Sequence, residues 1–229
     1  VCSSDLFRAR LELFADGELV GVSDAPFGWL PPDAADRAPA RRFVLIADRM
    51  TPRLMPALPP LVADVGAGAV VIPAWHSGFE AASIASQMVP IERAIDAMLD
   101  ARVQVGLSLP VVPDELATRA SVDPRDPLRL FAGDPALIEP YLARLVDRYG
   151  QVVQRWLIGS PAIGTVAQDA VLTEQLTRAD SALGRLVPGP IVAVPWDGAS
   201  TLPTEVTALP PDAMVMTEPQ GVGPGGIVD

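Results

Sequence analysis

Short apolar runs alternate with amphipathic segments along most of the chain. The runs that predict β-strands cover residues 42–48, 69–75, 103–110, 155–160, 190–196 and 213–217. Segments with apolar residues at helical spacing lie between some of them, at 89–101, 136–149 and 168–186. Strands that alternate with helices are typical of repeated βαβ units and a parallel sheet. Periodicity alone leaves two arrangements open, an open doubly wound sheet and a barrel.

The first 40 residues follow a different pattern. Apolar and charged residues alternate over 7–13, Asp16-Gly17 supplies a turn, and 18–23 resume extended character, which together predict a β-hairpin. The Pro- and Ala-rich stretch from Pro26 to Arg41 predicts a linker. We therefore expect a domain boundary near residue 40, with 7–40 and 41–229 as separate regions.

Two local signals predict helix ends. Asp134 followed by Pro135 is typical of a helix start, because the Asp side chain caps free N–H groups and Pro fits the first turn. Gly66 and Gly68 precede an expected strand, whereas the glycines of a dinucleotide-binding loop follow one. We interpret them as a helix C-cap and a turn rather than as a phosphate loop.

The misplaced glycines disfavour an open dinucleotide-binding sheet, so the expected fold is α/β, a (β/α)8 TIM-type barrel preceded by the hairpin. A complete eightfold barrel needs about 250 residues by itself, and this chain has 229 in all. We therefore expect a partial barrel of about six βα units.

Composition and charge disfavour two classes of partner. The formal net charge is −11, and the 17 basic residues are all Arg, which disfavours nucleic acid and anionic membranes as partners. No apolar run approaches the ~18 residues of a membrane span. The absence of Lys and Asn is typical of a GC-rich genome, such as a bacterial or metagenomic source.

Residues 1–6 resemble the translation of a sequencing-adapter tail, and we exclude them from the fold. They contain the single cysteine, so the rest of the chain offers no thiol, disulfide or cysteine–metal site. With one histidine in the chain, a multi-histidine metal centre is also excluded within it, and no cofactor is expected.

Candidate chemistry lies at the carboxyl ends of the expected strands, where parallel barrels place their sites. These positions carry Asp48, Trp75, His76, Ser108, Ser160, Trp196, Asp197 and Glu218. Indole faces stack on sugar rings, and carboxylates bind hydroxyls or perform acid/base chemistry. The set therefore predicts a carbohydrate site.

Each candidate also has a structural interpretation. Trp75 and Trp196 could cap the core, His76 could pack within its loop, and Asp48 could pair with Arg49 or cap a helix. Ser108 and Ser160 lack a Gly-x-Ser-x-Gly context, which argues against serine hydrolase chemistry.

The stretch from Tyr141 to Pro161, YLARLVDRYGQVVQRWLIGSP, resembles the approach to strand four in the clan A superfamily of retaining (β/α)8 glycoside hydrolases. There a helix ending in Tyr-Gly precedes a strand reading Trp-x-Ile-Gly-Asn-Glu. The run 89–110 is similar to the third βα step of those enzymes. The resemblance implies that the hairpin ends an N-terminal β-sandwich, and that the protein acts on or binds an oligo- or polysaccharide.

The sequence departs from that family at the catalytic positions. Ser160-Pro161 stands where the family has Asn-Glu, and Pro cannot act as the general acid/base. The family's nucleophile lies at strand seven, beyond the six strands expected here. Asp197 and Glu218 are the remaining candidate catalytic carboxylates.

Two functions remain open. One is a divergent glycoside hydrolase, exported or at the cell surface, that uses Asp197 or Glu218. The other is a barrel without catalysis that binds carbohydrate or serves as a scaffold. A third, an open-sheet enzyme with a phosphorylated ligand, has no anion loop to support it.

Overall fold

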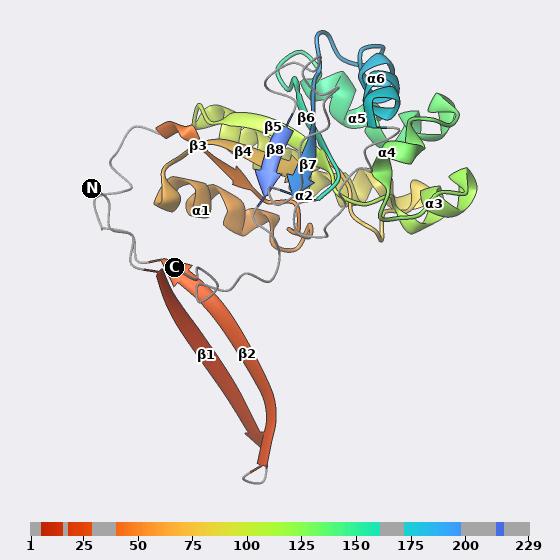
Figure 1. Ribbon diagram of the computed structural model, residues 1–229. Helices are drawn as coiled ribbons and strands as arrows, with labels where there is room; N and C mark the ends of the chain where they lie inside the picture. The colour runs from red at the N-terminus through yellow and green to blue at the C-terminus, as the bar shows by residue number, and fades with distance from the viewer. Residues whose placement is uncertain (1–5, 16–17, 29–39, 161–171, 198–213, 218–229) are drawn as a thin grey trace, which may run out of the picture.

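A computed structural model describes residues 6–15, 18–28, 40–160, 172–197 and 214–217, and all structural statements below concern these residues. Their main feature is a parallel sheet of six strands that curls into a half-barrel (Figure 1). The strands are β3 (Ala40–Ile46), β4 (Ala67–Pro73), β5 (Gln104–Leu109), β6 (Arg155–Ile158), β7 (Ile191–Asp197) and β8 (Met214–Thr217). The six expected strands are confirmed, each to within about two residues at either end.

Strand order separates the two arrangements that periodicity left open. The order in the sheet is β3-β4-β5-β6-β7-β8, and every neighbouring pair is parallel. A doubly wound sheet reverses its strand order at a switch point, because its two halves grow outward from the middle. This sheet is wound in one direction only, as a barrel is.

Helices lie between successive strands from β3 to β7. They are α1 (Leu58–Val65), α2 (Ile84–Asp100), α3 (Asp114–Ala120), α4 (Pro127–Leu130), α5 (Glu139–Tyr149) and α6 (Leu172–Leu183), with short 3-10 turns η2 (Met55–Ala57), η3 (Ala81–Ser83) and η4 (Pro135–Leu137). The helix expected from residue 89 begins at Ile84, because Ile84 and Met88 are buried and draw the earlier turns onto the core. Pro90 lies inside that helix. It keeps a helical φ and omits one backbone hydrogen bond.

The core lies between the helices and one face of the sheet. Alternate strand residues share this face, and they are Val70, Ile72, Val105, Leu107, Trp156, Ile158, Val192 and Val194. They form one buried cluster with helix residues such as Leu58, Ile91 and Leu142. Ala69 and Leu157, at the other parity, are also buried but lie outside this cluster. The main apolar layer of the described residues therefore lies between the sheet and the helices.

The expected hairpin is confirmed. β1 (Leu6–Ala15) and β2 (Glu18–Gly28) pair antiparallel (Figure 1). The linker was expected to begin at Pro26, but Pro26–Gly28 belong to β2, so that boundary was wrong. Pro is tolerated there because each strand of a two-stranded sheet has a free edge. The rest of the linker and the Asp16-Gly17 turn lie outside the described residues, and the β-sandwich stays a prediction.

The two local signals have different outcomes. Gly66 has φ 65° and caps the carboxyl end of α1, and the Asp134 side chain accepts a hydrogen bond from the Ala136 N–H at 2.9 Å, so both caps are confirmed. The turn expected at Gly68 is wrong, because β4 begins at Ala67, directly after the cap.

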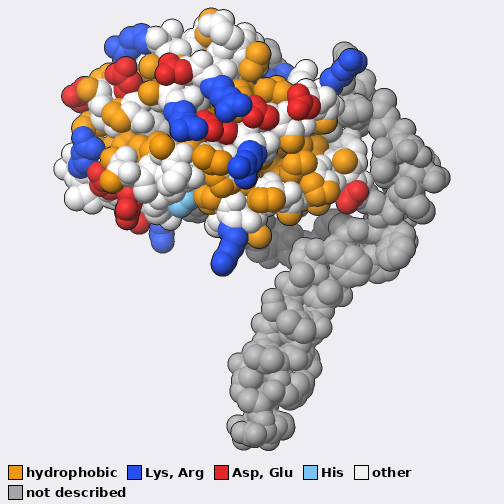
Figure 2. All heavy atoms as spheres, turned by 180° about the vertical axis from the view of Figure 1, so that it is seen from behind, with side chains coloured by type: hydrophobic (Ala, Val, Ile, Leu, Met, Phe, Trp, Pro, Cys, Tyr) orange, Lys and Arg blue, Asp and Glu red, His pale blue; other side chains and the backbone are white. Residues whose placement is uncertain are grey.

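Charged side chains of both signs are interspersed on the face shown in Figure 2, with apolar side chains between them. Among the described residues, no helix is both long and apolar enough to cross a membrane.

Candidate functional site: the carboxyl edge of the sheet

A hydrogen bond joins two strand ends that are not neighbours in the sheet. The Ser160 hydroxyl, after β6, donates to the Asp48 carboxylate, after β3. In a flat sheet these ends would be about 14 Å apart, since three strand spacings separate them. The contact therefore depends on the curl of the sheet, and it brings together two of the residues expected at the site.

Local backbone structure sets both side chains in place. Asp48 lies in a turn in which the Met50 N–H donates to the Ala47 carbonyl at 2.9 Å. Gly159 has φ 101°, a conformation that favours glycine, and its N–H donates to the Leu109 carbonyl at 3.0 Å. Gly159 thus extends the sheet ladder by one bond and turns the chain just before Ser160, which is fully buried.

Ser108 adds an uncommitted hydroxyl to this edge. It lies next to the end of β5, in register with Pro73 and Leu157 on the neighbouring strands. Its side chain has 0% exposure, and its Oγ has no hydrogen-bond partner among the described residues. A buried hydroxyl without a partner is unfavourable, so the Ser108 hydroxyl would gain from a hydrogen bond that the described residues do not supply.

Trp75 lies inside the protein rather than on an open surface. Its exposure is 0%, its Nε1 donates to the Val111 carbonyl, and its ring meets Tyr141 edge-on at 6.1 Å. In this conformation the indole offers no face to a sugar ring. The core-capping interpretation describes its geometry, and a stacking role stays a prediction.

His76 is half-buried in the loop after β4. Its ring meets Phe79 edge-on at 4.7 Å, and burial lowers the pKa of its imidazole, which favours the neutral form near pH 7. The loop is tied to α3, since the Asp114 N–H donates to the Ser77 carbonyl at 2.9 Å and the Ala81 N–H to the Glu115 carboxylate at 2.8 Å. This packing agrees with the structural interpretation of His76.

The candidate catalytic carboxylates cannot be placed in a site. Trp196 and Asp197 end β7, paired with Met216 and Thr217 of β8, and their side chains lie outside the described part of the structure. Glu218 lies wholly outside it. Their catalytic and binding roles stay predictions.

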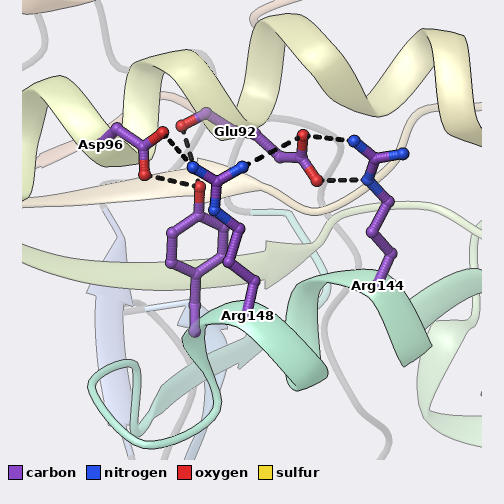
Figure 3. Close-up of polar contacts among 5 residues, drawn as sticks. Glu92, Asp96, Arg144 and Arg148 are labelled. Carbon is purple, nitrogen blue, oxygen red and sulfur yellow. Dashed lines mark hydrogen bonds and ion pairs between the residues drawn. The ribbon is translucent and has the colours of Figure 1, made fainter.

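A second polar cluster lies between α2 and α5, and the sequence interpretation missed it (Figure 3). Arg144 forms a two-pronged pair with Glu92, and Arg148 bonds Asp96 at 2.7 Å. The Tyr149 hydroxyl donates to Asp96 at 2.8 Å. The sequence held a signal for it. Glu92 and Asp96 are four residues apart on α2, and Arg144 and Arg148 are four residues apart on α5, so each pair lies on one helix face.

This cluster also shifts proton affinities. The hydrogen bond from Arg144 lowers the pKa of the Glu92 carboxyl, although its burial opposes that shift. Burial and the bond to Asp96 raise the pKa of the Tyr149 hydroxyl. Both effects hold the residues in the charge states that bind one another, which is a structural role.

No family model matches the sequence, and no curated protein matches it. Function must therefore be inferred from the chemistry of the carboxyl edge. Within the described residues no group of three metal-binding side chains comes together. The described part of the edge includes the hydroxyls of Ser108 and Ser160 and the carboxylate of Asp48, groups that suit a polar ligand with hydroxyl groups.

Proposed function

We propose that the chain is part of a (β/α)8 barrel of the glycoside hydrolase type, and that it binds a carbohydrate at the carboxyl edge of its sheet. The sequential strand order and the curl of the sheet support this fold. The carboxyl edge is the expected site because ligands of such barrels bind at the carboxyl ends of the strands. In this proposal residues 7–40 end a β-sandwich that precedes the barrel.

The bond between Asp48 and Ser160 carries the proposal. It places a carboxylate and a hydroxyl from β3 and β6, which are not neighbours in the sheet, beside each other. Ser108, whose hydroxyl has no partner among the described residues, lies toward the same edge. A carboxylate accepts hydrogen bonds from sugar hydroxyls, and a serine hydroxyl both donates and accepts.

Binding without turnover is the favoured form of the proposal. Retaining hydrolysis needs two carboxyl groups about 5 to 5.5 Å apart, one of them at the position that Pro161 occupies in this chain. Asp48 is already engaged with Ser160. Catalysis by Asp197 or Glu218 is the alternative.

A polysaccharide panel tests both forms with the full chain. We expect binding of at least one neutral oligosaccharide, reduced about tenfold by Asp48→Ala and retained by Glu174→Gln, an exposed carboxylate that pairs with Arg178. No bound saccharide in the panel would contradict the proposal. Hydrolysis products that disappear in Asp197→Asn or Glu218→Gln would establish the catalytic alternative instead.

A further inference from the structure

A polar hollow lies at the opposite, amino-terminal edge of the sheet. It is bounded by the end of α2, the first residues of β5, the segment before β6 and the first residue of β7. Its polar side chains are Arg102, Gln104, Gln154 and Arg155, and none of the described residues that line it is Asp or Glu. The hollow is therefore a local concentration of hydrogen-bond donors in a chain whose net charge is −11.

The two arginines of the hollow differ from others in the chain. Arg119, Arg144 and Arg178 each pair with a carboxylate. Arg102 and Arg155 form no ion pair within the described residues, and both are exposed. A guanidinium group presents a planar set of donors that matches a phosphate in two-pronged geometry.

Arg102 occupies a backbone position that favours glycine. Its φ is 59°, at the residue that follows the cap of α2. The Val103 N–H donates to the Met98 carbonyl at 2.9 Å and the Arg102 N–H to the Leu99 carbonyl at 3.0 Å, the pattern of a Schellman motif. A cation there also favours the helix carboxyl end. That effect accounts for Arg102 but not for Arg155 or the two glutamines.

Gly106 leaves room beside Arg155. The two residues are in register on neighbouring strands, and a Cβ at Gly106 would lie 3.3 Å from the Arg155 Cβ. Without that Cβ, the Arg155 stem lies against the sheet without crowding.

We propose that this hollow binds the phosphate group of a small phosphorylated ligand, held by Arg102 and Arg155 with the amides of Gln104 and Gln154. Two guanidinium charges match a phosphate dianion. The site is independent of the carbohydrate site, since it lies at the other edge of the sheet.

Calorimetric titration of the full chain with inorganic phosphate tests the proposal. We expect saturable binding that Arg155→Gln weakens about tenfold. Arg102→Gly should weaken it similarly while leaving the melting temperature equal or higher, because glycine prefers this φ. Arg93→Gln, an exposed arginine outside the hollow, should bind phosphate as the unchanged protein does.

Three results would overturn the proposal. They are no phosphate binding by the unchanged protein, equal binding by the Arg102→Gly/Arg155→Gln double variant, and binding of acetate as tight as that of phosphate.

Discussion

The α2–α5 layer and the carboxyl edge use polar residues in opposite ways. Between the helices, Glu92, Asp96, Arg144 and Arg148 satisfy one another through several ion pairs and hydrogen bonds. At the carboxyl edge one bond joins Asp48 to Ser160, and Ser108 has no partner among the described residues. The helix cluster is satisfied within the protein, whereas the carboxyl edge has a buried hydroxyl that no described residue satisfies.

The largest expected effect on stability is at Trp75, where one substitution distinguishes a packing role from a stacking role on a ligand. Trp75→Ala should lower the free energy of unfolding by about 3–5 kcal/mol, because it empties a fully buried site. Urea denaturation measures this, with Trp75→Phe as a milder control. A loss of saccharide binding with unchanged stability would instead assign the indole to the ligand site.

Glu92→Gln tests the helix layer. It should lower stability by about 2 kcal/mol at pH 7, because it removes a charged partner of Arg144. The folded-state pKa of Glu92 is lowered, so this contribution is present above the ordinary value of 4.5 and is lost as pH falls through the folded-state pKa. Denaturation curves of the two proteins should therefore differ at pH 7 and converge at low pH.

Glu174→Gln is the matched control for that prediction. Its partner Arg178 is an exposed i,i+4 neighbour, so the change should cost less than about 0.5 kcal/mol. Equal losses in the two variants would contradict a special role for the α2–α5 cluster.

Ser160→Ala should cost about 1 kcal/mol, because it removes the hydrogen bond to Asp48. A double-mutant cycle with Asp48→Ala should show coupling of similar size. Additive losses would mean that the bond contributes nothing to stability.

Ser108→Ala should have the smallest effect on stability, neutral or slightly favourable, since it removes a buried hydroxyl without a partner among the described residues. The same variant should weaken saccharide binding. A loss of stability as large as that of Ser160→Ala would show that the hydroxyl is already satisfied in the fold.

Local sequence was sufficient for the strands and caps. Apolar runs located all six strands, and Gly66 and Asp134 marked two helix ends, because each depends on a few adjacent residues. Periodicity did not predict the strand order, since it describes single elements and not their neighbours. The sequential order followed only from the expectation of a barrel. The burial of Trp75 also depends on partners such as Tyr141, which is 66 residues further along the chain.

Long-range contacts were missed for the same reason. Glu92 and Arg144 are 52 residues apart, and only the packing of α2 on α5 brings them together. The bond from Ser160 to Asp48 additionally requires the curl of the whole sheet.

Sequential strand order also has a consequence for how the chain folds. Each strand pairs with the one made just before it, so the sheet can grow one crossover at a time during synthesis. The contact between Asp48 and Ser160 spans 112 residues and requires four strands in place. It should form late, so substitutions there should speed unfolding and leave the folding rate almost unchanged.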